Sequence, residues 1–428
     1  MTAPGAASQE RARFGPGIYV HYPFCRSRCG YCDFFVVLAD RPARTQFFGS
    51  LLGEVDLAAA DPLWEAQRFQ TIFLGGGTPS LLSVEEIAAL LGRLRDRFDI
   101  AAGAEITMEC NPESLRLEAI RGYRDAGVNR ISLGVQSMDP EELALLDRAH
   151  GVEEVARRVK ELREGGVASF NLDLIYGLPR NSDGRLGSDD RLRGSTGVGA
   201  ESGDGRHASS DARFRSRDES WRETLERTLA LEPPHLSAYL LSLEPHVPLA
   251  RRMERGELTS PADESAVAQY EELRARAERH GLMQYEISNF ARPGQESRHN
   301  QNYWLRGDYL GLGPSAHSHR EGYRWSNLRS LPAYRERIAT GTLPREGEME
   351  QLDARAAAEE WLFLGLRRTE GIAWNVLEES GLPLGGLEDA ATKLAREGWL
   401  VWEGGRLRLD PRAYFISNTV FAELAAAL

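Results

Sequence analysis

Residues 19–34 read YVHYPFCRSRCGYCDF and hold three of the chain's four cysteines, Cys25, Cys29 and Cys32. Three residues separate the first two thiols and two separate the last two. Thiolates are soft ligands that select iron–sulfur clusters or zinc, but structural zinc sites favour paired two-residue spacings and close all four metal positions. Three thiols without any metal are also disfavoured, because lone buried cysteines do not cluster. The spacing therefore favours a [4Fe-4S] cluster whose fourth iron is open to a ligand from solution.

Around this segment, short apolar runs alternate with amphipathic stretches, a pattern typical of a parallel sheet wrapped by helices. We predict an α/β fold, a partial (β/α)6 barrel open on one side, with its chemistry at the carboxyl ends of the strands. The cysteine loop follows the first strand, as this arrangement requires. The predicted strands are 17–21, 70–74, 105–110, 130–135, 169–175 and 235–241, and the helices between them include 45–60, 84–98 and 152–164.

The second predicted strand ends in a glycine-rich turn, LGGGTPS at residues 74–80. Glycines let the backbone approach a ligand closely and point its amides inward, which suits a carboxylate or an amino group. Such turns are common at strand ends, so the neighbouring cysteines give this one its significance.

Polar side chains follow the next strands: Glu109, Gln136 and Asp173 stand at three strand ends, and Arg148 follows the fourth strand. A lone acid or amide there is commonly a cap or a loop hydrogen bond, but these recur in register. Together they offer acceptors for an ammonium and hydroxyls and a cation for a carboxylate. The fourth cysteine, Cys110, ends an apolar strand, so we expect it to pack in the core and not to bind the cluster.

The cysteine triad and its flanks resemble the radical S-adenosylmethionine (SAM) superfamily, in which the amino and carboxylate groups of SAM chelate the open iron. Residues 19–34 are similar to the branch that holds oxygen-independent coproporphyrinogen III oxidases and HemW-type heme chaperones. Two residues after the third cysteine the oxidases carry a fourth cysteine and the chaperones a phenylalanine; this chain has Phe34. The resemblance implies SAM contacts for Tyr19, Tyr31, Gly76, Gly77, Thr78, Glu109, Gln136, Arg148 and Asp173.

A second informative segment is HNQNYW at residues 299–304. Histidine is a common axial ligand of heme iron, and aromatic side chains offer a face to a porphyrin. From the residues alone, a single histidine beside aromatics is more often structural. The string is, however, characteristic of the HemW-type chaperones, and this resemblance implies heme binding by His299, Tyr303 and Trp304. Residues 311–318, GLGPSAHS, also match this branch, with glycines suited to a tight loop.

The net charge of −12 disfavours a nucleic-acid binder, and residues 1–16 contain no apolar run that could act as a signal peptide or anchor. We expect a cytoplasmic protein, because the triad needs reduced thiols.

The expected parts are a disordered N-terminus at 1–16, the barrel at 17–245 with a disordered insertion at 180–217, an extension at 246–345 with the His-Asn-x-x-Tyr-Trp segment, and a smaller winged-helix-like α+β domain at 346–428. Within the last, the sequence predicts helices at 353–368 and 388–397 and a hairpin at 399–409, in a lid or docking role.

Three functions are compatible with these features. The first is a heme chaperone that carries a [4Fe-4S] cluster, SAM and heme, takes electrons from a donor, and delivers heme to hemoproteins such as membrane-associated respiratory enzymes. The second is the oxidative decarboxylation of coproporphyrinogen III through a 5′-deoxyadenosyl radical. The third is a cluster-bearing interaction or redox-sensing protein, which would not need SAM contacts at successive strand ends. Phe34 and the segment that begins at His299 favour the chaperone.

Overall fold

A computed structural model describes residues 11, 13–38, 40–181 and 216–428. All six predicted strands are present and run parallel, hydrogen-bonded in the spatial order β9-β7-β6-β5-β4-β1. β1, β6 and β7 are almost wholly buried, whereas β5 is buried mainly from Ala104 onward and the last two residues of β9 are exposed. The buried stretches read as continuous apolar runs. Their bounds are β1 (Gly17–Tyr22), β4 (Arg68–Gly76), β5 (Asp99–Cys110), β6 (Arg130–Gln136), β7 (Ser169–Tyr176) and β9 (His235–Leu240).

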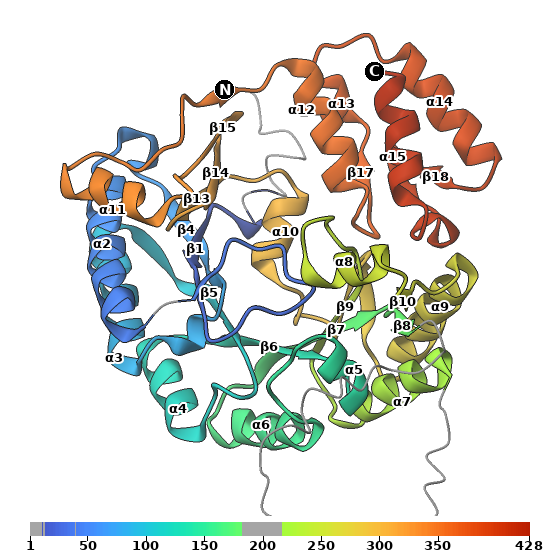
Figure 1. Ribbon diagram of the computed structural model, residues 1–428. Coiled ribbons are helices and arrows are strands. Elements are labelled where there is room, and N and C mark those ends of the chain that lie inside the picture. The colour runs from blue at the N-terminus through green and yellow to red at the C-terminus, as the bar shows by residue number, and fades with distance from the viewer. Residues whose placement is uncertain (1–10, 12, 39, 182–215) are drawn as a thin grey trace, which may run out of the picture.

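Helices connect these strands and lie around the outside of the sheet (Figure 1). The predicted helices at 84–98 and 152–164 are present, and the one predicted from residue 45 starts four residues earlier. Asp40 caps it by accepting the Ala43 amide hydrogen at 3.0 Å, and Pro42 fits its first turn. The connecting helices are α2 (Arg41–Ala59), α3 (Val84–Arg97), α4 (Leu117–Ala126), α5 (Pro140–Leu145), α6 (Val152–Glu164) and α7 (Arg217–Ala230).

The segment after β9 adds strands to both edges of the same sheet, and its last strand, at residues 350–351, lies within the part predicted as the C-terminal domain. On one edge β11 and β12 continue antiparallel from β9, and on the other β13 pairs parallel with β1 and leads into β14, β15 and β16. The strands are β11 (Met283–Glu286), β12 (Asn289–Ala291), β13 (Tyr309–Leu312), β14 (His317–Arg320), β15 (Tyr323–Ser326) and β16 (Glu350–Gln351). The helices are α8 (Pro248–Glu254), α9 (Asp263–Arg279), α10 (Arg298–Trp304) and α11 (Leu331–Ala339).

A buried carboxyl fixes the loop between β13 and β14. Glu54 of α2 is 1% exposed and accepts hydrogen bonds from the Gly313 amide at 2.7 Å, from the Asn327 side chain and from the Tyr334 hydroxyl. Burial raises the pKa of Glu54 to about 7, although the three donors oppose the shift. Because its oxygens are paired, this buried polar group is a specific link between α2 and the loop that leads into β14.

The last part of the chain forms a separate unit of helices with a three-stranded sheet (Figure 1). The predicted hairpin is present as β18 and β19, and the predicted helix at 353–368 ends as an α-helix at Glu360 and continues as a π-helical turn to Gly365. An ion pair between Arg306 and Glu360 attaches this unit to the segment after α10. Its elements are α12 (Ala354–Glu360), β17 (Ile372–Ala373), α13 (Asn375–Glu378), α14 (Gly385–Arg396), β18 (Leu400–Glu403), β19 (Arg406–Leu409) and α15 (Ser417–Ala426).

Most of the two segments predicted to be disordered, 1–16 and 180–217, lies outside the described residues. At their edges, Arg11 lies over the Trp361 ring at 4.7 Å, and a short strand, β8 (Arg180–Asn181), pairs with β10 (Leu258–Thr259). No helix within the described ranges is long and apolar enough to cross a membrane.

Candidate functional site

The three clustered cysteines lie on the loop that follows β1. Cys25 ends the short strand β2 (Phe24–Cys25), and the loop returns at β3 (Val37–Leu38), which pairs with it. Within the loop, the Cys32 amide donates to the Cys29 carbonyl at 3.2 Å. All three thiols are free and half-buried, and they line one cavity of about 420 Å³ at the carboxyl ends of the barrel strands. The predicted location of the cysteine loop is thus the one observed.

The glycine turn after β4 lies directly against the start of the cysteine loop. The Gly77 amide donates to the Tyr22 carbonyl and the Thr78 amide to the Phe24 carbonyl, both at 2.8 Å. A Cβ on Gly77 would lie 2.7 Å from the Phe24 carbonyl oxygen, so only glycine permits this approach. The Thr78 hydroxyl also donates to the Cys25 sulfur at 3.4 Å. The turn therefore positions the first thiol as well as lining the cavity.

Arg148 connects a second thiol to the strand ends. One of its nitrogens donates to the Cys29 sulfur at 3.5 Å, and another donates to the Asn111 side chain at 2.8 Å and to the Gly134 carbonyl at 3.1 Å. A cation at this distance stabilises a thiolate. Gln136, at the end of β6, has a φ of +66°, a conformation that non-glycine residues seldom adopt and that is common at ligand sites.

Two half-buried carboxyl groups, those of Glu109 and Asp173, line the cavity. Glu109 accepts the Gly76 amide hydrogen at 3.1 Å, and Asp173 accepts from Ser132 at 2.9 Å and from Asn171 at 2.6 Å. Burial, and then the charge of Asp173, raises the pKa of Glu109 to about 8. Burial also raises the pKa of Asp173. A bound cation would offset the cost of ionising these groups.

The residues present fit a [4Fe-4S] cluster with SAM. The donor set is three free thiols on one loop, with hydroxyl and guanidinium donors beside two of them. Among the described residues, no three His, Cys, Asp or Glu side chains converge closely enough to hold a single metal ion. A cluster differs from such a site, since each thiolate takes its own iron. The two carboxyls and the glycine turn supply acceptors and amide donors suited to an amino acid.

Eight of the nine residues predicted to contact SAM line this cavity together with the three cysteines: Tyr31, Gly76, Gly77, Thr78, Glu109, Gln136, Arg148 and Asp173. The ninth, Tyr19, lines a neighbouring cavity, where its hydroxyl hydrogen-bonds His21 at 3.1 Å. Sequence reasoning missed Asn111, Ser132 and Tyr239, which also line the first cavity. Asn111 directly follows Cys110 at a strand end and could have been found by the same rule that gave Glu109. Cys110 itself is 3% exposed, with its thiol directed at the Met108 carbonyl at 3.9 Å.

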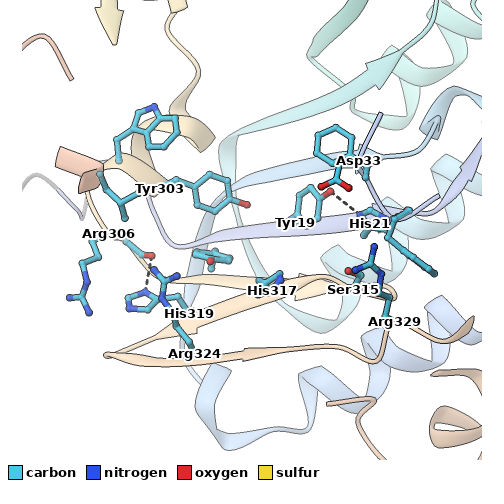
Figure 2. Close-up of a pocket in the computed structure, with 16 residues that line it drawn as sticks. Tyr19, His21, Asp33, Tyr303, Arg306, Ser315, His317, His319, Arg324 and Arg329 are labelled. Carbon is cyan, nitrogen blue, oxygen red and sulfur yellow. Dashed lines mark hydrogen bonds between the residues drawn. The ribbon is translucent and has the colours of Figure 1, made fainter. Parts of the chain in front are cut away.

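The neighbouring cavity has a volume of about 510 Å³ and combines aromatic with basic side chains (Figure 2). Tyr303 and Trp304 of the predicted heme segment line it. Phe34 lines both cavities and is 66% exposed. The charged and imidazole side chains that line this second cavity are His21, Asp33, Arg306, His317, His319, Arg324 and Arg329.

His299, predicted to bind heme, does not line this cavity. It is 1% exposed, and its two ring nitrogens pair with the Thr71 hydroxyl at 2.7 Å and the Tyr303 hydroxyl at 2.9 Å. Burial lowers its pKa to about 3. The Glu105 carboxylate accepts its backbone amide hydrogen at 3.0 Å. In this structure His299 thus anchors α10 to β4 and β5 and positions Tyr303 at the cavity wall.

Comparisons with known proteins agree with this geometry. The radical SAM superfamily profile matches residues 19–190, and the HemN C-terminal domain profile matches residues 352–416. The solved structure of coproporphyrinogen III oxidase (HemN) from Escherichia coli, described as a radical SAM enzyme, superimposes with a TM-score of 0.76, covering 98% of this chain and 93% of that chain at 23% identity. The molecule has the radical SAM fold with a C-terminal domain, as predicted.

Sequence relatives define the branch more narrowly. The heme chaperone HemW of Mycobacterium tuberculosis is 37% identical, over 98% of this chain and 97% of the relative. HemW of Bacillus subtilis is 30% identical, over 96% and 99%, and HemW of Escherichia coli is 36% identical, over 70% and 69%. This chain belongs to the HemW family of heme chaperones.

Proposed function

We propose that the protein binds heme and delivers it to hemoproteins, and that it holds a [4Fe-4S] cluster and SAM beside the heme. The relatives that cover almost the whole chain carry the name of heme chaperone. The observation that carries the proposal is the pair of adjoining cavities: one lined by the thiols and strand-end residues, the other by aromatic and basic side chains, with Phe34 lining both.

In the first cavity, we assign Cys25, Cys29 and Cys32 to three irons of the cluster, and Glu109 and Asp173 to the ammonium and ribose hydroxyls of SAM. Thr78 and Arg148 donate hydrogen bonds to the Cys25 and Cys29 sulfurs, which holds these two ligands in place. When bound, the cluster and SAM supply one-electron chemistry. Because the thiols must stay reduced, we place the protein in the cytoplasm.

In the second cavity, we assign Tyr303 and Trp304 to the porphyrin face. The His299 ring supports Tyr303 from behind through the hydrogen bond between its Nε2 and the tyrosine hydroxyl. The recipients we propose are hemoproteins such as respiratory enzymes, and an external donor would reduce the cluster.

The second candidate function is coproporphyrinogen III oxidation, because the HemN structure shares this fold. Phe34 argues against it, since the oxidases carry a cysteine at that position. The shared fold alone does not separate the two activities.

Heme transfer tests the proposal. We expect the cluster-loaded protein to bind one hemin and to pass it to an apo-hemoprotein, seen as growth of the Soret band of the acceptor. Supplied anaerobically with SAM, reductant and coproporphyrinogen III, it should form no protoporphyrinogen. Formation of that product without hemin binding would establish the oxidase instead.

Proton release tests the role of Glu109. Its pKa of about 8 means that the free protein carries a proton there at pH 7. The SAM ammonium should favour the carboxylate, so binding at pH 7 should release up to about one proton, and affinity should rise as pH approaches 8. Calorimetry in buffers of different ionisation enthalpy measures the release. Glu109→Gln should abolish it; the same release from that variant would assign the proton to another group, for which Asp173→Asn is the comparison.

A further inference from the structure

Histidine is a common axial ligand of heme iron. Four histidines lie in or behind the second cavity: His21, His299, His317 and His319. Two of them have both ring nitrogens hydrogen-bonded. His21 pairs with the Tyr19 hydroxyl at 3.1 Å and the Phe35 carbonyl at 2.9 Å, and both nitrogens of His299 are paired within the barrel. In the third, His319, Nδ1 donates to the Gly307 carbonyl at 3.1 Å and Nε2 has no partner within the described residues, but the side chain is only 2% exposed, so this nitrogen is not accessible to a ligand.

The fourth, His317, is the first residue of β14 and is exposed to the cavity (Figure 2). Among the residues that the structure describes, none forms a hydrogen bond with its ring. Burial lowers its pKa, the Arg324 cation lowers it further, and Glu346 opposes the shift. A neutral imidazole keeps the nitrogen lone pair that a metal needs.

The same cavity has more donors than acceptors. Three buried N–H groups in its lining have no partner within the described part of the chain: Trp304 Nε1, Arg306 Nη2 and Arg324 Nε. Arg306 and Arg324 share a single carboxylate, that of Glu360. Unpaired buried donors are costly, so a ligand that supplies acceptors would stabilise this arrangement.

A third arginine stands at the open side. Arg329 is exposed, lies over the Phe35 ring at 5.5 Å, and forms no ion pair with any described residue. Figure 2 shows it at the opposite end of the cavity from Arg306 and Arg324. The one carboxylate of the lining, Asp33, pairs with His246 at 2.7 Å and so leaves this cation unbalanced. The cavity therefore offers cations at both ends, an imidazole between them and aromatic walls.

We propose that His317 is the axial ligand of heme iron in this cavity and that Arg324 and Arg329 bind the heme carboxylates. The inference rests on the proposed heme binding and specifies its site. The lone pair of a neutral ring nitrogen of His317 fills one open axial position of ferric heme, and no electron is transferred. Arginine suits the carboxylates because its planar guanidinium forms paired hydrogen bonds with them. A cavity of about 510 Å³ is of the size that holds cofactors.

Hemin and metal-free protoporphyrin IX distinguish the proposed iron contact of His317 from the proposed carboxylate contacts of the arginines. Hemin needs both the imidazole and the arginines, whereas metal-free protoporphyrin IX needs only the arginines. We expect His317→Ala to weaken hemin binding by about tenfold or more, to abolish the histidine-ligated optical and EPR signature, and to leave protoporphyrin IX binding unchanged. Added imidazole should restore the signature in the variant, which shows that the cavity is still folded.

His299→Ala and His280→Ala are the matched variants. His280, at the end of α9, is exposed and lies outside the cavity lining, so its loss should change nothing. The histidine signature should persist in His299→Ala, even if loss of the support for Tyr303 weakens both porphyrins together. If the histidine signature were lost in His299→Ala and retained in His317→Ala, the assignment of His317 would be wrong, but the proposed heme-binding function would still stand. Failure of the unsubstituted protein to bind hemin would instead overturn the proposed function.

The carboxylate contacts have their own test. Arg329→Gln should weaken hemin and protoporphyrin IX by a similar factor, about threefold to tenfold, and should not affect hemin dimethyl ester, which has no carboxylates. Arg329→Lys should recover part of the loss. Equal affinity of the unsubstituted protein for hemin and for its dimethyl ester would exclude the arginine contacts.

Discussion

Cys25→Ser, Cys29→Ser and Cys32→Ser are each expected to abolish the iron–sulfur cluster, lowering bound iron and sulfide to below about one-tenth of the unsubstituted protein's content. A serine hydroxyl is a hard and weakly acidic ligand, so it cannot replace a thiolate on iron. The three thiols share one loop and one cavity, hence the loss of any one should remove the whole cluster. Iron and sulfide analysis after anaerobic reconstitution measures this effect, and SAM cleavage by the reduced protein should vanish with it.

Cys110→Ser is the matched control, because Cys110 lines the same cavity and undergoes the same chemical change. Its thiol is buried and directed at the Met108 carbonyl, so this variant should retain its iron. Hemin binding gives a second readout: the cysteine variants should keep it, since no cysteine lines the second cavity. Full iron content in Cys25→Ser, or its loss in Cys110→Ser, would refute the assignment of the triad.

Gly77→Ala is expected to have the second-largest effect, a loss of SAM binding by about tenfold or more together with a destabilisation of roughly 1–3 kcal/mol. The added Cβ would lie 2.7 Å from the Phe24 carbonyl oxygen and 2.9 Å from the Pro23 carbonyl carbon. These are backbone atoms, so the glycine turn and the cysteine loop must move apart. That movement would break the paired hydrogen bonds that Gly77 and Thr78 donate to Tyr22 and Phe24.

Gly92→Ala is the control for the same chemical change elsewhere in the barrel. Gly92 lies within α3, and a Cβ there meets no atom within 4 Å. Alanine in a helix interior should stabilise the protein by about 0.5–1 kcal/mol and leave SAM binding unchanged. SAM titration of the reconstituted proteins and denaturant unfolding compare the two variants. Unchanged SAM affinity in Gly77→Ala would mean that the turn does not form the SAM site.

Much of the barrel could be predicted from the sequence, because most of each strand is buried and reads as an apolar run. The cysteine loop and the strand-end residues followed from a single topological rule, that parallel strands end at one edge. Gln136 fits that rule, although its positive φ leaves no trace in the sequence.

The second cavity could not be predicted in the same way. His299 stands in a distinctive string, yet its ring pairs with Thr71, 228 positions away in the sequence, and no local pattern reveals which way the ring turns. His317 comes from β14 and Arg329 from the loop after β15, and both line one cavity with Phe35, which lies about 300 residues earlier in the sequence. Their sequence signal was weak, since a histidine after a glycine-rich loop suggests only a turn. Long-range packing, not local propensity, assembled that site.

The pairing of β1 with both β4 and β13 has a consequence for biogenesis. The first strand of the barrel acquires its second neighbour only when Leu310, the partner of Ile18, has left the ribosome. Strands β4 to β9, the glycine turn and the cysteine loop are all synthesised before that point. The nascent chain can therefore complete the walls of the first cavity while the second cavity still lacks His317, Arg324 and Arg329. Such late, distant pairing slows folding, and it delays completion of the proposed heme site until the strands after β13 have been synthesised.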